Sequence, residues 1–170
     1  MKQYFVVLGC VVTILVLFIG CTQQSAHRGY SNVLYGFSMD PPVGWTSVEN
    51  ESVDVVVRFT PLNETSVSLL VEPPVILSEG LALSTFADTV EENLSASGMN
   101  YTMVYREWRS IPGVTAYEIA YSYEEGKTVQ RVKQVAIQRT RTVFLVTFTA
   151  PSALYIRYLT SVDQSIDTFL

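Results

Sequence analysis

The sequence predicts an α+β fold in which helices pack on a mainly antiparallel sheet of about six strands. Three observations support this class. Residues 101–150 contain four β-branched and aromatic runs in succession, residues 83–97 follow a helical period, and the last twenty residues return to that period. Few connections are long enough for parallel crossovers, which need a dozen or more residues. Neighbouring strands are therefore expected to run antiparallel, with the helices covering the sheet.

The first part of the folded region is predicted to contain short strands separated by proline-containing turns. It opens with residues 35–39, after which two prolines and a glycine fix a tight turn before Trp45. We interpret Trp45 as a core residue. Residues 54–59 and 66–71 are β-branched runs bounded by prolines, and both are predicted strands.

Two amphipathic helices are predicted, each with a single apolar stripe. In residues 83–97 the acidic side chains face away from the stripe, and Gly98 suits the helix end. The second helix begins at Pro151-Ser152. The stripes consist of Leu83, Phe86, Val90 and Leu94 in the first helix, and Leu159, Val162, Ile166 and Phe169 in the second.

Between the helices, residues 101–109, 115–123, 128–139 and 142–150 are predicted strands of one meander. A two-residue loop at Glu125-Gly126 would place Glu118 opposite Lys133 and Glu124 opposite Lys127. The same reasoning around Thr140-Arg141 places Ile137 opposite Phe144 and Val135 opposite Val146.

The N-terminus predicts export and attachment to a membrane. Lys2 precedes an uncharged apolar run over residues 4–20, which ends in Gly20-Cys21. We interpret residues 1–21 as a signal peptide with a lipobox, with Cys21 as the lipid attachment site. The alternative is an uncleaved helical anchor over residues 4–20, near the lower length limit for a membrane span. Both alternatives predict a location at the cell membrane, facing the extracytoplasmic side.

Two further segments follow the signal region. Residues 22–32 are polar and are predicted to be a spacer, and residues 33–170 are predicted to form one globular domain. Four of the five asparagines begin glycosylation sequons, which supports an extracytoplasmic address. These possible glycosylation sites are Asn50, Asn63, Asn93 and Asn100. The alternative is that the sequons are only a turn-rich surface pattern.

Composition argues against several functional classes. The formal net charge is −5, and an acidic domain is not expected to bind nucleic acid. Both cysteines, Cys10 and Cys21, lie in the signal region, and the only histidine, His27, lies in the spacer. The predicted domain therefore lacks the residues for a disulfide, a thiolate metal site or a Ser-His-Asp triad. We expect no cofactor, no metal and no enzymatic activity.

A candidate partner surface combines aromatic and basic side chains. Tyr117, Tyr121 and Tyr123 alternate on one predicted strand, and tyrosine is enriched at protein interfaces. Arg131 and Lys133 belong to a segment, residues 126–162, that contains no acidic residue. The alternatives are that the tyrosines are buried under a helix and that the basic side chains pair with acids such as Glu118.

Four segments carry a resemblance to the PsbP family, the extrinsic proteins of photosystem II and their lipoprotein relatives. They are Gly36-Phe37-Ser38, Pro42-Val43-Gly44-Trp45, the strand from Phe144 to Pro151, and the helix end from Ser165 to Phe169. The resemblance covers about residues 30–170. It implies an α/β/α sandwich and a non-catalytic accessory role.

These observations favour a membrane-tethered extracytoplasmic accessory domain that docks on a membrane complex or on another exported protein. The alternative is a lipoprotein that binds a small molecule or an ion in a pocket between sheet and helix.

Overall fold

A computed structural model describes residues 29–78, 81–98 and 100–170. Eight of its strands form one sheet with the order β3-β4-β5-β10-β9-β8-β7, and β6 pairs with β10. Strands β1 and β2 form a separate two-stranded ladder. The elements are β1 (Tyr30–Asn32), β2 (Phe37–Met39), β3 (Trp45–Ser52), β4 (Val55–Pro61), β5 (Ser68–Val71), β6 (Val75–Ile76), α2 (Leu83–Ala96), β7 (Tyr101–Ile111), β8 (Val114–Glu125), β9 (Thr128–Arg139), β10 (Thr142–Pro151) and α3 (Ser152–Ile166).

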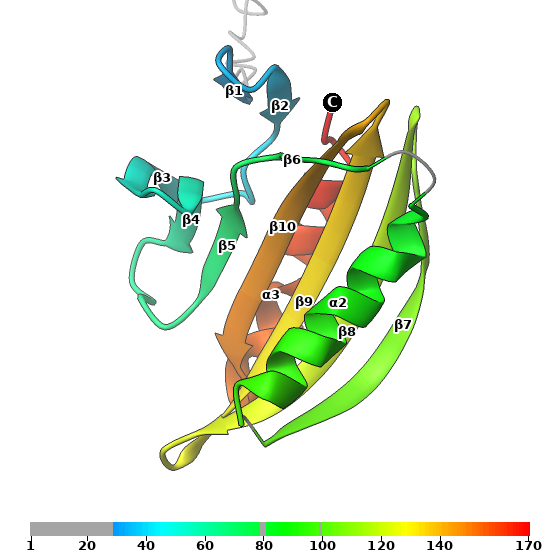
Figure 1. Ribbon diagram of the computed structural model, residues 1–170. Coiled ribbons are helices and arrows are strands. Elements are labelled where there is room, and N and C mark those ends of the chain that lie inside the picture. The colour runs from blue at the N-terminus through cyan, green and yellow to red at the C-terminus, as the bar shows by residue number, and fades with distance from the viewer. Residues whose placement is uncertain (1–28, 79–80, 99) are drawn as a thin grey trace, which may run out of the picture.

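The two helices cover opposite faces of the sheet (Figure 1). Helix α2 packs on β7, β8 and β9, whereas α3 packs on β9 and β10. The result is the three-layer arrangement that the PsbP resemblance implies. All strand pairs are antiparallel, as the short connections predict.

The predicted number of strands was wrong, because the described residues contain ten strands rather than about six. Three of the unpredicted strands, β1, β2 and β6, have only two or three residues. The fourth, β3, is an edge strand whose residues after Trp45 are all exposed, so its sequence has no apolar alternation. Strand β1 also lies within residues 22–32, so the folded region begins by Tyr30 rather than at residue 33.

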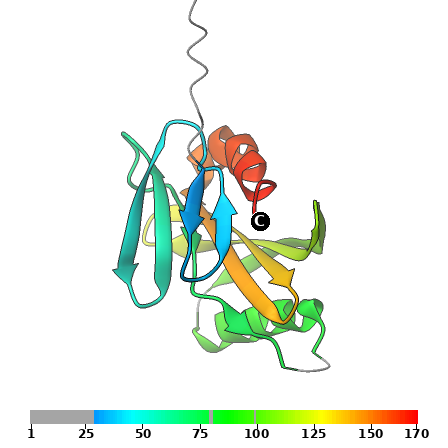
Figure 2. The same cartoon turned by 90° about the horizontal axis from the view of Figure 1, so that it is seen from above.

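The main core lies between α3 and the sheet and is rich in phenylalanine. Phe37 of β2 stacks on Phe169 with ring centroids 5.2 Å apart, and both rings contact Phe144 of β10. The C-terminus is fixed there because Ser38 and Leu170 exchange two backbone hydrogen bonds. Figure 2 shows the β1–β2 ladder beside this C-terminal end. Trp45 packs edge-to-face on Tyr158 at the margin of the core and is only partly buried.

One predicted register is confirmed and the other was wrong by two residues. Phe144 faces Ile137 and Val146 faces Val135, as predicted. In the β8–β9 hairpin, Glu125 pairs with Thr128, so the loop is Gly126-Lys127. Gly126 has φ +62°, and two-residue hairpin turns need a positive φ at their first central position, which glycine adopts without strain. Glu118 therefore faces Val135 instead of Lys133, and Glu124 faces Val129 instead of Lys127.

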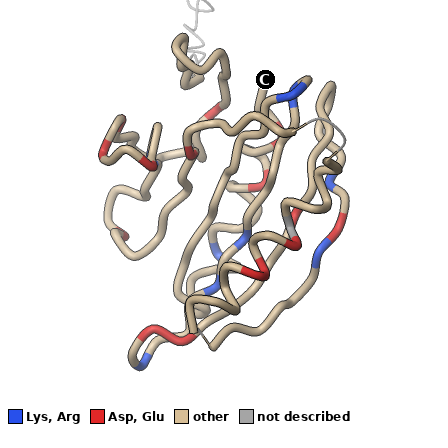
Figure 3. Tube along the Cα trace, in the orientation of Figure 1, with Lys and Arg blue, Asp and Glu red and all other residues tan. Residues whose placement is uncertain are grey.

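The signal and anchor predictions fall on residues outside the described part of the chain. Within the described residues, none of the helices is long and apolar enough to span a membrane. Figure 3 shows acidic residues along α2 and basic residues at the turn between β9 and β10.

Candidate functional site

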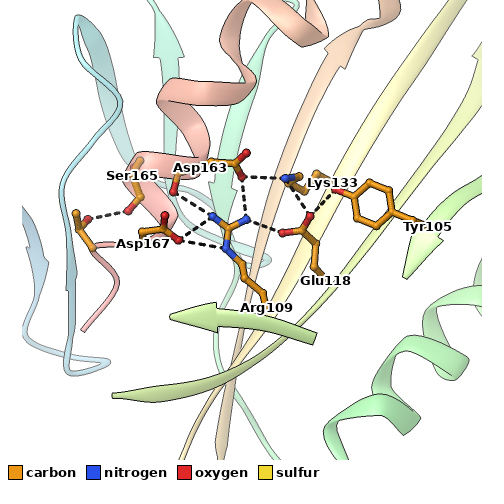
Figure 4. A network of polar contacts seen from close by, with 8 residues as sticks. Tyr105, Arg109, Glu118, Lys133, Asp163, Ser165 and Asp167 are labelled. Carbon is orange, nitrogen blue, oxygen red and sulfur yellow. Dashed lines mark hydrogen bonds and ion pairs between the residues drawn. The ribbon is translucent and has the colours of Figure 1, made fainter. Parts of the chain in front are cut away.

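A ring of ion pairs connects three strands of the sheet to α3 (Figure 4). Arg109 Nη1 lies 2.6 Å from Glu118 Oε2 and 2.8 Å from Asp163 Oδ1. Lys133 Nζ lies 3.0 Å from Glu118 Oε1 and 2.8 Å from the same Asp163 oxygen. Each carboxylate is thus bound by both cations, and each cation by both carboxylates.

Two further side chains extend this ring. Arg109 Nη2 lies 2.8 Å from Asp167 Oδ1 and also donates to the backbone oxygen of Asp163. The hydroxyl of Tyr105 donates a hydrogen bond to Glu118. We call these six residues the α3 network: Tyr105, Arg109, Glu118, Lys133, Asp163 and Asp167.

Strand register brings these residues together. Glu118 faces Val135, and Lys133 faces Ala120, so the two charged side chains are diagonal neighbours on one face of the sheet. Both are only 4% exposed. Asp163 of α3 and Asp167, the residue just after α3, are four residues apart, which places both side chains on one side of the helix.

The α3 network is arranged for stability rather than for acid–base chemistry. Burial raises the pKa of Tyr105, and its hydrogen bond to Glu118 raises it further. Burial opposes the charge of Arg109, but hydrogen bonds to Asp163, Glu118 and Asp167 outweigh this effect and raise its pKa. Neither group changes protonation near neutral pH. Among the described residues, no group of three or more His, Cys, Asp or Glu side chains could hold a metal ion.

A cleft of about 160 Å³ lies beside the α3 network, between the sheet and α3. Its lining comes from β7, β8, β9 and the first half of α3, and Arg131 is the only formally charged residue among the described residues that line it. Val104 reaches it from an irregularity in the β7–β8 register. We call this the α3 cleft, lined by Val104, Tyr105, Ala120, Tyr121, Arg131, Val132, Tyr155, Ile156 and Leu159.

The predicted partner residues do not form one surface. Tyr117, Tyr121 and Tyr123 pack in the clusters beneath α2, and Tyr121 is only 7% exposed. Lys133 is buried on the opposite face, in the α3 network. Arg131 lines the α3 cleft, to which Tyr121 also contributes. The structure therefore agrees with the two alternative interpretations of these residues. The tyrosines pack under a helix, and Lys133 forms an ion pair with Glu118.

Sequence reasoning missed four members of the α3 network: Tyr105, Arg109, Asp163 and Asp167. One signal was available, because Asp163 ends the acid-free segment and has a second aspartate one helical turn later. The four sequon asparagines, Asn50, Asn63, Asn93 and Asn100, are all exposed. Attachment of sugars to them stays a prediction.

Glu72 belongs to a smaller polar chain on the sheet. The amide of Gln134 donates to the hydroxyl of Thr147, which donates to Glu72 Oε1 at 3.2 Å. Burial raises the pKa of the Glu72 carboxyl, and the Thr147 hydrogen bond opposes this only in part. The folded state therefore binds a proton at Glu72 more tightly than the unfolded state does.

We predict that Glu72→Gln stabilises the protein at neutral pH. A raised carboxyl pKa contributes stability below the unfolded-state pKa, and this contribution is lost as pH rises through the folded-state pKa. The thermal midpoint of the variant should exceed that of the wild type at pH 7. The expected rise is about 2–4 °C for each kcal/mol by which the substitution increases the free energy of unfolding. The difference should vanish by about pH 4. Glu92→Gln, on the exposed side of α2, is the control, and an equal gain there would refute the assignment.

The same fold occurs in solved structures of low sequence identity. PsbP from the cyanobacterium Synechocystis sp. PCC 6803 matches with a TM-score of 0.65 and 17% identity, over 84% of this chain and 91% of that protein. LpqN of Mycobacterium tuberculosis, which is involved in cell envelope biogenesis, matches with a TM-score of 0.58 and 12% identity, over 79% and 82% of the two chains.

The Ran-binding protein Mog1p of Saccharomyces cerevisiae matches with a TM-score of 0.57 and 9% identity, over 84% of this chain and 94% of that one. No family model matches the sequence, and no curated protein sequence matches it. These similarities establish that the chain has the PsbP-like α+β fold.

Proposed function

We propose that this chain is a membrane-tethered, extracytoplasmic interaction domain without catalytic activity, which docks on an exported or membrane-bound protein. The fold supports a binding role, since it is shared with a Ran-binding protein and with a protein of cell envelope biogenesis. The α3 network supports a non-catalytic role, because its charged groups are already paired with one another.

The observation that carries the docking proposal is an apolar and basic patch at one end of the molecule. Its apolar members are Val33, Leu34 and Ile76, which are 92%, 82% and 77% exposed. Its basic members are Arg139, the last residue of β9, and Arg141, which lies in the turn between β9 and β10, and both are also exposed. We call these five residues the end patch.

A side-chain hydrogen bond and two strand pairings join the parts of the end patch. Arg139 donates a 2.8 Å hydrogen bond to the backbone oxygen of Gly36, in the turn that carries Val33 and Leu34. Thr142 pairs with Arg139 on one side and with Ile76 on the other. Figure 1 shows the β1–β2 ladder and β6 at the same end as this turn.

The chemistry of the end patch defines the partner. Exposed apolar side chains at a turn have no role in the core, and an apolar patch with a polar rim is typical of a protein interface. Neither Arg139 nor Arg141 has an ion-pair partner within the described residues. We therefore expect a protein partner with an apolar contact surface and acidic side chains at its edge.

Site-specific photocrosslinking tests this assignment in native membranes. A photoreactive residue at Leu34 should give one protein adduct, which disappears when Arg139 and Arg141 are both replaced by glutamate. The control position is Leu62, which is 73% exposed but lies in the turn between β4 and β5. Adducts with lipid alone at Leu34, or identical protein adducts at both positions, would overturn the proposal.

Tethering is tested separately at Cys21. We predict that metabolic labelling with a lipid precursor marks the wild-type chain and not Cys21→Ser, because the thiol is the proposed attachment point. Labelling of both chains, or of neither, contradicts this prediction. Membrane retention of both chains without label would instead favour a helical anchor over residues 4–20.

A second candidate function is the binding of a small molecule. The α3 cleft favours it, because the cleft is a mostly apolar concavity between sheet and helix with a single cationic side chain.

A further inference from the structure

We propose that the α3 cleft binds a small monocarboxylate whose apolar body is about the size of one aromatic ring. This ligand site goes beyond the docking function, since it lies between α3 and β7–β9, whereas the end patch lies on the β1–β2 turn, β6 and the β9–β10 turn. The proposal rests on the shape of the cleft, on its apolar lining and on the charge of Arg131.

The volume and lining of the α3 cleft determine the body of the ligand. The cleft measures about 160 Å³, and apolar side chains from both the sheet and the helix form most of its wall. Among them are Val104 of β7, Ala120 of β8 and Ile156 of α3. A dry apolar cavity of about 150 Å³ is enough to bind benzene. A single ring or a compact branched chain therefore fits.

Arg131 determines the charged group of the ligand. Its guanidinium carbon lies 5.5 Å from the centre of the Tyr155 ring, a cation–π contact that holds the group at the wall of the cleft. Within the described residues Arg131 forms no ion pair, while Glu118 and Asp163 are each bound by Arg109 and Lys133. The guanidinium is thus free to bind an anion, and it matches a carboxylate in a planar, two-point contact.

A single positive charge also favours a monoanion over a dianion. A phosphate monoester would bring a second negative charge into a cleft with no further cation in its lining. Burial raises the pKa of Tyr155 to about 12, so its hydroxyl stays protonated at neutral pH and does not compete with the ligand for Arg131. One carboxylate and one cation therefore leave the site neutral.

Equilibrium dialysis of the full chain in phosphatidylcholine nanodiscs tests the proposal, with radiolabelled benzoate and benzamide as probes. We expect saturable binding of one benzoate per chain, above the background of empty nanodiscs, and at least about tenfold weaker binding of the neutral benzamide. Arg131→Gln should weaken benzoate binding by a similar factor and leave benzamide binding unchanged.

Arg157→Gln is the matched control. Arg157 lies over the ring of Tyr158 at the same distance, 5.5 Å, but does not line the α3 cleft. This variant should bind benzoate as the wild type does, whereas Ala120→Leu, checked for folding by circular dichroism, should abolish binding by filling the cleft. Absence of saturable benzoate binding, equal binding of the two probes, or equal losses in Arg131→Gln and Arg157→Gln would overturn the proposal. None of these outcomes depends on crosslinking at the end patch.

Discussion

Replacing Arg109 by methionine is expected to lower the free energy of unfolding by about 3–5 kcal/mol. The Arg109 side chain is 13% exposed and binds three carboxylates, those of Glu118, Asp163 and Asp167. Without it, Lys133 alone would face these acids, and the excess negative charge would stay beneath α3. Removing one partner from a buried ion pair is costly because the remaining charge is desolvated and uncompensated. Urea denaturation, with its midpoint and slope, measures the effect.

Arg106→Met is the matched control for this experiment. Arg106 lies on the same strand and also links the sheet to a helix, through Asp88 and Glu91 of α2. Its side chain is 49% exposed, however, so solvent screens both ion pairs and their loss should cost less than about 1 kcal/mol. Similar losses in the two variants would mean that the α3 network contributes no more than a surface ion pair.

Truncating Phe169 to alanine is expected to cost about 3–5 kcal/mol. The ring is fully buried, it stacks on Phe37, and it contacts Phe144. Its removal should leave a cavity, because backbone hydrogen bonds fix the chain around residue 169. Among these bonds are the two between Ser38 and Leu170. The same denaturation experiment should show one transition with a lower midpoint and an unchanged slope.

The neighbouring Leu170 provides the control, because its side chain is 63% exposed. Leu170→Ala should change the free energy of unfolding by no more than about 0.5 kcal/mol. A Phe169→Ala variant as stable as Leu170→Ala would show that the C-terminal segment is not packed between β2 and β10.

Local patterns predicted the longer elements of this fold, those that bury one face over several residues. The apolar stripe predicted α3, whose Val162 and Ile166 are fully buried, but the helix ends at Ile166 and Phe169 packs in the core beyond it. The facing pairs of β9 and β10 followed from the apolar alternation around a short turn. In both cases the period of the hydrophobic residues reflects the burial of one face, so the pattern alone carries the information.

Elements without such a pattern could not be predicted. Strand β3 is exposed at Thr46 and beyond, and over these residues it is held mainly by its pairing with β4. The two-residue error in the β8–β9 register arose because either Glu125-Gly126 or Gly126-Lys127 can form a tight turn. When each residue faces a partner two positions further along the neighbouring strand, every side chain stays on the same face of the sheet. The apolar alternation therefore could not distinguish the two registers.

The sequence by itself determined the fold class, both helices and the absence of histidine and cysteine from the folded region, whereas the membrane address stays a prediction. The expected ion pair between Lys133 and Glu118 also forms, although the two residues are diagonal neighbours rather than directly opposite each other. Only the tertiary structure decided that Arg109 and Asp163 form ion pairs with Glu118 and Lys133. It also decided that Arg131 lines a cleft on the same face of the sheet without an ion-pair partner among the described residues. The physical reason is distance along the chain. Arg109 and Asp163 are 54 residues apart, and a contact of that separation is set by the packing of α3 on the sheet.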